Sequence, residues 1–432
     1  MTEITRTELM PGVNFRAVHT AKFKSAYLSI TFMAPLSPRT AAENALVPYV
    51  LRRGSREHPD MQSLSAALDE LYGGSVEPVV RRKGETQCVG FAASFLDDAY
   101  TLEGEQVLEP ACRLLGELLL RPRVQDGVFC PEYVAGERAN LIDRIRAQIN
   151  DKRAYSITRL TQLMCREEAF GTDMWGGEEQ AAAITPDSLW RRYQALLSAG
   201  EIEVYYCGSA GEERVRRAML SALEGLPRAQ ELERADCEIR LTAGPEPQVA
   251  EEAMDVTQGK LAIGFRTGGM SVWEPEYPAL AVLNALYGGT SLSKLFLNVR
   301  EKLSLCYFAS STLERMKGVI WVSSGIEFDK YRQARDEILE QLEAIRRGEI
   351  EPWELDGARS IMATGLRSTL DSQARQEDFW LGQAAAGLDE PPESLALRVE
   401  AVTREQVVEA AKRLELDTIY FLKGKEAGEH GV

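Results

Sequence analysis

Histidine is scarce in this chain, with three residues among 432: His19, His58 and His430. A catalytic zinc ion needs about three protein ligands, and two histidines four residues apart on a helix commonly supply two of them. No two of these histidines lie within one helical turn of each other. The seven cysteines form no C-x-x-C pair that could replace them. We therefore expect no bound metal and no other cofactor.

Several other features are absent. No run of about 18 apolar residues occurs, so no transmembrane helix is expected. The N-terminus lacks the basic-then-apolar pattern of a signal peptide, and an odd number of scattered cysteines is typical of a reducing compartment. The formal net charge of −16 disfavours binding to nucleic acid or to an anionic membrane. These absences predict a cytoplasmic protein that binds neither nucleic acid nor membrane.

The chain is too long for one hydrophobic core, and it contains internal matches. In each match the segments have the same pattern, either a strand before a helix, a helix before a strand, or a strand–turn–strand. The matches occur in the same order in both halves, which favours duplication of one unit. The matching segments are 26–32 with 260–265, 79–91 with 313–322, and 184–207 with 402–422.

The predicted organisation is two homologous domains, residues 1–224 and 251–432, joined by a polar linker over 225–250 that contains proline and glycine. Strands and helices are grouped rather than strictly alternating. This grouping predicts an α+β fold, in which a mostly antiparallel sheet carries helices on one face. Apolar spacing predicts helices over 40–53, 97–120, 131–150, 276–287, 328–347 and 352–372.

The segment 293–307 carries the strongest candidate site residues. An apolar stripe predicts a helix over 291–301, with Arg300 beside the stripe, and a strand follows that carries Tyr307. The arginine fork suits a peptide carbonyl or carboxylate, and the tyrosine hydroxyl adds a donor. Gly288 and Gly289 would let a backbone turn approach a ligand. The structural alternatives are a helix-terminal cation, a packed strand tyrosine and a glycine C-cap.

This segment resembles the C-terminal signature of the insulinase-like (M16, pitrilysin) zinc peptidases. The resemblance implies that Arg300 and Tyr307 hold a substrate peptide, and that two αβ-roll domains enclose a chamber like a clamshell. The family's H-x-x-E-H motif corresponds to Ala45, Pro48 and Tyr49, so both histidines and the general-base glutamate are replaced. Glu137 is the nearest candidate for the third zinc ligand. Pro48 either interrupts a helix here or marks the start of one near residue 47.

The resemblance implies a non-catalytic subunit in a bacterial heterodimer, whose partner carries H-x-x-E-H and whose substrate is a peptide. We expect no activity from this chain alone. The alternative is a metal-free scaffold that binds a peptide or protein, because some bacterial relatives with a degenerate motif are associated with protein modification. An active metallopeptidase with an unusual site conflicts with the histidine count.

Overall fold

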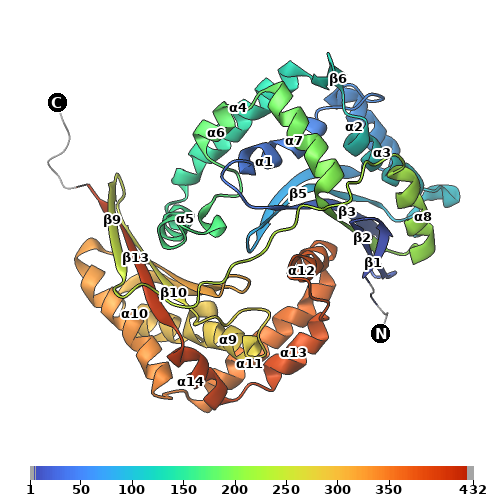
Figure 1. Ribbon diagram of the computed structural model, residues 1–432. Helices are drawn as coiled ribbons and strands as arrows, with labels where there is room; N and C mark the ends of the chain where they lie inside the picture. The colour runs from blue at the N-terminus through green and yellow to red at the C-terminus, as the bar shows by residue number, and fades with distance from the viewer. Residues whose placement is uncertain (1–3, 5, 426–432) are drawn as a thin grey trace, which may run out of the picture. The chain divides into compact units, whose positions relative to one another are not determined.

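The computed structural model describes residue 4 and residues 6–425. The chain forms two compact units, each built around one main sheet (Figure 1). Unit 1 contains the residues up to Arg146, Thr172–Asp236 and Gln373–Asp389. Unit 2 contains Ala147–Gly171, Cys237–Ser372 and the residues from Glu390 onward. Each unit therefore includes a short segment that comes from the other half of the chain.

The sheet of unit 1 has six strands in the order β1-β2-β8-β3-β5-β4. Only β2 and β8 run parallel, and the other neighbours are antiparallel. The strands are β1 (Arg6–Met10), β2 (Val13–His19), β3 (Ser25–Pro35), β4 (Ser75–Lys83), β5 (Thr86–Leu96) and β8 (Glu201–Gly208). A separate short hairpin joins β6 (Val124–Gln125) and β7 (Val128–Phe129).

The sheet of unit 2 repeats this arrangement with five strands in the order β11-β12-β10-β13-β9. Its one parallel pair, β9 with β13, occupies the place of β2 with β8. The sequence matches lie at equivalent places in the two sheets: β3 with β10, β4–β5 with β11–β12, and β8 with β13. The strands are β9 (Gln248–Met254), β10 (Gly259–Arg266), β11 (Cys306–Glu314), β12 (Val319–Ile326) and β13 (Glu415–Gly424).

One face of each sheet is covered by helices and forms the main core of that unit. Side chains alternate across a strand, so Leu28, Ile30 and Phe32 of β3 all enter the same core. The predicted α+β fold, a mostly antiparallel sheet with packed helices, is confirmed. The unit 1 helices are α1 (Ala41–Leu51), α2 (Met61–Glu70), α3 (Leu108–Leu120), α4 (Pro131–Ala147), α6 (Glu178–Ala182), α7 (Pro186–Ala199) and α8 (Glu212–Ala222).

In unit 2 the equivalent face packs Leu261, Ile263 and Phe265 of β10 against helices. Two of these helical segments have π-helical hydrogen bonding, η5 (Ala285–Gly289) and η6 (Leu295–Lys302). We call the short segment that each unit takes from the other half of the chain its exchanged segment; in unit 2 this is Ala147–Gly171. The other α-helices of unit 2 are α9 (Tyr277–Asn284), α10 (Tyr331–Arg346), α11 (Pro352–Ser368), α13 (Pro392–Glu400) and α14 (Arg404–Lys412).

The opposite face of each sheet carries one helix from the exchanged segment. In unit 1 this helix is α12 (Gln373–Ala385), where Glu377 accepts a 3.1 Å hydrogen bond from the Ser29 hydroxyl and a 2.5 Å bond from Arg81. In unit 2 it is α5 (Lys152–Met164), whose Met164 lies where a Cβ on Gly264 would stand. In each unit, therefore, the sheet face opposite the main core is covered by a helix from the other half of the chain.

Most predicted helices lie close to their expected ranges, but residues 97–120 do not form one helix. The 3₁₀ turns η1 (Asp98–Tyr100) and η2 (Leu102–Gly104) come first, and α3 begins only at Leu108. Glu103 and Gly104 have left-handed backbone angles, which interrupt a right-handed helix. Asp98 then accepts the backbone N–H groups of Val107 and Leu108, so it caps α3 from outside the helix. Four further 3₁₀ turns of the same length lie beside other helices: η3 (Gln148–Asn150), η4 (Ala169–Gly171), η7 (Phe328–Lys330) and η8 (Thr369–Asp371).

Candidate functional site

Arg300 and Tyr307 are brought together in unit 2 by the connection from η6 to β11. Arg300 lies in the last turn of η6, where Ser304 N–H donates to the Arg300 carbonyl at 3.1 Å and Leu305 N–H to that of Val299 at 3.0 Å. Ser304 has a φ of 51°, a strained angle for a residue with a side chain. This sharp reversal lets the chain enter β11 directly after the helix.

Tyr307 occupies a β-bulge at the start of β11. Cys306 pairs with Ile326 and Phe308 with Gly325, so Tyr307 is the extra residue between two paired positions. A bulge re-aims the side chain of the extra residue away from the regular alternation. Tyr307 is accordingly 60% exposed, although β11 is otherwise largely covered. Sequence patterning did not predict the bulge, because the extra residue appears only when β11 is paired with β12.

The two side chains line one solvent-open cavity of about 420 Å³, together with Glu327 and Lys330. The Arg300 side chain is 41% exposed, lies 3.5 Å from Glu301 and stacks over the Phe296 ring at 4.7 Å. The Tyr307 hydroxyl has a long 3.5 Å contact to Glu327. Both groups are weakly engaged by the protein, so they keep hydrogen-bonding capacity for a ligand carbonyl or carboxylate.

Gly288 and Gly289 are not among the residues that line this cavity. They end η5, and a Cβ on Gly288 would stand 2.5 Å from the backbone nitrogen of Ser311 in β11. A Cβ on Gly289 would meet Asn284 at 3.0 Å. Gly288 thus permits close packing of η5 on β11, the strand that carries Tyr307. The structure gives it a positioning role toward the candidate site.

The stretch that corresponds to the zinc motif lies in α1 of unit 1. Helix α1 begins at Ala41 and runs through Pro48, so the alternative in which a helix begins near residue 47 is wrong. Ala45 and Pro48 are buried in the core, and Tyr49 is half-buried. The methyl group and the pyrrolidine ring offer no metal ligand and no general base. The helix tolerates the proline because tertiary packing surrounds it.

Cationic and aromatic side chains surround this altered site. Arg144 of α4 donates to the Tyr49 hydroxyl, and its guanidinium lies over the rings of Tyr49 at 4.7 Å and Trp175 at 4.4 Å. The buried Glu137 is paired with Arg53 at 3.2 Å. A cation therefore neutralises the carboxylate that was the candidate third ligand. Two cation–π contacts and a hydrogen bond thus hold the Arg144 guanidinium against Tyr49 and Trp175.

The remaining potential ligands are dispersed. His58 Nδ1 lies 3.0 Å from Glu117, and His19 Nδ1 lies 3.3 Å from the carbonyl oxygen of Ala210. His430 is outside the described residues. Within residue 4 and residues 6–425, no group of three or more histidine, cysteine, aspartate or glutamate side chains could hold a metal ion. The same residues contain no helix that is both long and apolar enough to cross a membrane.

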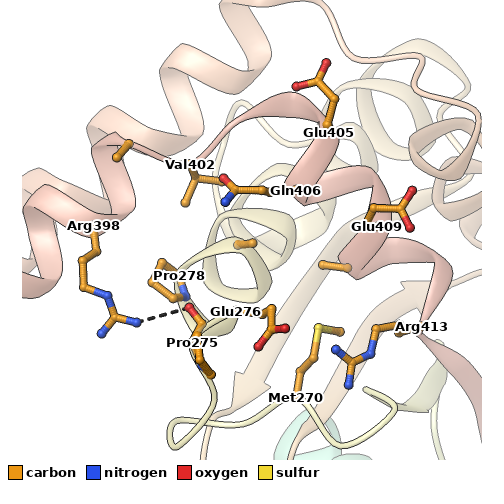
Figure 2. A pocket seen from close by; sticks show the side chains of 13 residues that line it. Met270, Pro275, Glu276, Pro278, Arg398, Val402, Glu405, Gln406, Glu409 and Arg413 are labelled. Carbon is orange, nitrogen blue, oxygen red and sulfur yellow. Dashed lines mark hydrogen bonds between the residues drawn. The ribbon is translucent and has the colours of Figure 1, made fainter.

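A separate cavity of about 580 Å³ lies on the helical side of unit 2, between the start of α9 and the α13–α14 region (Figure 2). Its guanidinium groups are bonded internally: Arg398 donates to the Pro275 carbonyl at 3.3 Å and Arg413 to that of Gly268 at 2.6 Å. None of the residues predicted as site residues lines it. The candidate site is therefore the cavity at Arg300 and Tyr307.

Comparison with known proteins agrees with this fold. Residues 183–362 match the family model for the peptidase M16 inactive domain. The chain is 35% identical over 418 residues to the "Probable inactive metalloprotease YmfF" of Bacillus subtilis, covering 96% of each chain. The chain therefore belongs to the M16 peptidase family, and the replaced zinc motif makes it a metalloprotease-like member of the inactive type.

Solved structures give the same result for the fold. A crystal structure of a conserved protein from Enterococcus faecalis matches with a TM-score of 0.90 and 28% identity, covering 99% of this chain and 100% of that one. The structure of a peptidase M16 inactive domain from Pseudomonas fluorescens matches with a TM-score of 0.80 and 16% identity, covering 98% and 99%. At that lower identity the likeness concerns the fold alone.

Proposed function

We propose that this chain is the substrate-holding, non-catalytic subunit of a two-chain zinc peptidase, whose partner supplies H-x-x-E-H. The observation that carries the proposal is the contrast between the two sites. The zinc-motif positions hold Ala45, Pro48 and Tyr49, whereas Arg300 and Tyr307 line an open cavity with little internal bonding. Fold stability alone does not explain a bulged, exposed tyrosine beside a half-exposed arginine that lies 3.5 Å from Glu301.

In this proposal Arg300 and Tyr307 bind the peptide backbone and stabilise negative charge as it develops on the scissile carbonyl oxygen. An arginine fork and a phenol are donors that need little rearrangement when that charge appears. The partner supplies the metal, the activated water and the general base. This chain contributes only positioning and electrostatic stabilisation.

The test is to purify the tagged chain from its native extract and to assay the recovered material for chelator-sensitive peptidase activity. We expect a stoichiometric partner bearing H-x-x-E-H, and activity that requires both chains. Arg300→Ala should lower kcat/KM of the pair about 100-fold, the effect of losing one oxyanion donor, without loss of the partner. Arg166→Ala is a matched control, because Arg166 is 70% exposed and its closest ion-pair contact is 4.0 Å.

The second candidate is a metal-free scaffold that holds a peptide or a partner protein, including one in a protein-modification pathway. The same open cavity supports it, since binding requires no metal. Recovery of the chain alone, or with a protein lacking H-x-x-E-H and without chelator-sensitive activity, would favour the scaffold and contradict the peptidase subunit. If function stays intact after substitution of both Arg300 and Tyr307, this cavity is not the binding site in either proposal.

A further inference from the structure

A second cavity adjoins the candidate site through Tyr307. It has a volume of about 750 Å³ and is lined by Lys152, Asp255, Lys260 and Tyr307 with neighbouring polar residues. Tyr307 also lines the Arg300 cavity, so a ligand in contact with the phenol can reach both. Lys152 begins α5, and Lys260 lies near the start of β10, so both belong to unit 2.

Three cations lie at or near this cavity: Lys152 and Lys260 line it, and Arg153 contacts the same Phe308 ring as Lys260. Arg153 donates to the Ser310 hydroxyl at 2.8 Å and lies 4.3 Å from the Phe308 ring centroid. The Lys260 ammonium lies 5.7 Å from the same ring and donates to the Gln258 side chain. Among the described residues, no carboxylate forms an ion pair with Lys152, Arg153 or Lys260. Other cations of this chain, such as Arg266 and Lys294, are paired with carboxylates.

Two nearby carboxylates, Asp151 and Asp255, compensate this positive charge only in part. Asp151 accepts the backbone N–H groups of Arg153 and Ala154 at 3.0 Å each, so it serves as the N-cap of α5. Asp255 is the acidic side chain in the lining. Burial and the positive charge of Arg153 lower the pKa of Lys260, and the opposing charge of Asp151 does not fully offset them. Two like charges held near one aromatic ring would be stabilised by an anion between them.

We propose that this cavity is a carboxylate subsite, which binds an acidic side chain or the C-terminal carboxylate of a peptide. The inference rests on the proposed function, in which Arg300 and Tyr307 hold the backbone of that peptide. It also reverses the expectation from net charge, because an acidic protein would be expected to prefer basic peptides. The local charge at the site, rather than the total charge of the chain, determines the preference.

The test measures binding to the purified full-length chain by fluorescence polarisation. The probes are fluorescein-labelled alanine-based peptides that carry one Glu or one Gln, each with a C-terminal acid or amide. We expect the peptide with a carboxylate to bind about 10-fold more tightly than its neutral counterpart. The Glu/Gln arm and the acid/amide arm show whether the carboxylate comes from a side chain or from the chain end.

The variant Lys260→Met keeps the aliphatic stem beside Phe308 and removes the charge. We expect the ratio of the two Kd values to fall from about 10 to about 1, with the Kd of the neutral peptide unchanged. Lys152→Gln should reduce the ratio in the same direction. Lys412→Met on α14 is the matched control, because Lys412 is paired with Glu409 at 2.7 Å and is outside this cavity.

Equal Kd values for acidic and neutral peptides would overturn the proposal, as would a preference that survives both lysine variants. Failure of every peptide to bind at about 1 mM would overturn it too. Arg300→Ala separates the two proposals, because it should raise the Kd of acidic and neutral peptides by the same factor. If Arg300→Ala has no effect while the lysine-dependent preference persists, the carboxylate subsite stands and the proposed function fails.

Discussion

The α1 stretch of unit 1 and the Arg300–Tyr307 region of unit 2 differ in opposite physical ways, since one is packed and the other is open. In unit 1 the zinc-motif positions are closed: Ala45 and Pro48 are core residues, and the Arg144 guanidinium lies over Tyr49 and Trp175. In unit 2 the Arg300 and Tyr307 side chains are 41% and 60% exposed and line a cavity. The first region serves packing, and the second leaves its polar groups available to a ligand.

Under the proposed function, this difference means that replacement of the metal ligands in one unit leaves the peptide-binding residues of the other unit in place. Converging histidines and carboxylates destabilise a fold when no metal is bound, because their buried polar atoms lack partners. Replacement by Ala45 and Pro48 and pairing of Glu137 with Arg53 remove that cost. An exposed arginine and tyrosine carry little such cost, since water satisfies them. Their exposure in a bulged, strained segment is what the proposed peptide binding requires.

The largest expected effect concerns the exchanged segment that supports the open site. Glu168 follows α5 and lies 2.6 Å from Arg266 and 2.9 Å from Lys317, both fully buried cations. Glu168→Gln leaves these cations without their shared carboxylate, although Arg266 retains Asp417 at 3.1 Å. We expect a loss of about 3 kcal/mol of unfolding free energy, measured by denaturant unfolding. Backbone amides of α5 should exchange faster in the variant than in the unsubstituted protein. An equal increase in exchange throughout the chain would contradict a local role of Glu168.

The same carboxylate predicts a dependence on pH. Burial alone would raise the pKa of Glu168, but hydrogen bonds and charges from Arg266 and Lys317 outweigh it and lower the pKa. A carboxyl with a lowered pKa contributes stability above its unfolded value of about 4.3, and this contribution is lost as the pH falls through the folded value. We expect protection of α5 to decrease below about pH 4. In Glu168→Gln this acid step should be absent.

Gly288 tests whether the open site depends on packing behind it. Gly288→Ala would place a methyl group 2.5 Å from the Ser311 backbone nitrogen, so η5 or β11 must shift. We expect about 2 kcal/mol of destabilisation and weaker peptide binding through Tyr307. Gly365→Ala is the matched control: it lies within α11 with no atom within 4 Å of the added Cβ. The control should gain up to about 1 kcal/mol of unfolding free energy. Equal changes in unfolding free energy for the two variants would contradict close packing of Gly288 on β11.

Local patterns predicted much of the fold. The three sequence matches fall on equivalent elements because alternation and helical spacing depend on neighbouring residues. The exchange of α5 and α12 was not predicted, since an amphipathic helix does not reveal which sheet will cover it. The break before α3 was missed for a related reason: the cap is the Asp98 side chain, nine residues before Val107.

The candidate site was predicted in part. Arg300 and Tyr307 are close in the chain, and they line one cavity as a local pattern could suggest. The bulge at Tyr307 depends on pairing with β12, and the three unpaired cations come from α5 and β10. The Arg144 contacts join residues from α1, α4 and a loop. Such contacts between distant segments carry no periodic signal in the sequence.

Arg144 tests whether the closed site is now only structural. Arg144→Ala removes two cation–π contacts and the hydrogen bond to Tyr49. Because the arginine is exposed, we expect a modest loss of about 1 kcal/mol in unfolding free energy. Peptide binding and the activity of any pair should stay unchanged, in contrast to Arg300→Ala. A loss of activity without a loss of stability would show that the closed site still takes part in function.

The smallest expected effect is that of zinc on this chain alone. A ligand stabilises a protein only if the folded state offers a site for it, by an amount set by the ratio of its concentration to Kd. No metal-binding group exists among the described residues, and Arg53 already neutralises Glu137. One equivalent of zinc, or an excess of chelator, should therefore leave Tm unchanged to within about 1 °C. Metal analysis of untagged protein provides the independent check. Stoichiometric zinc with a rise in Tm would break the comparison between a closed and an open site, because the closed site would then hold a metal through ligands other than those of the motif.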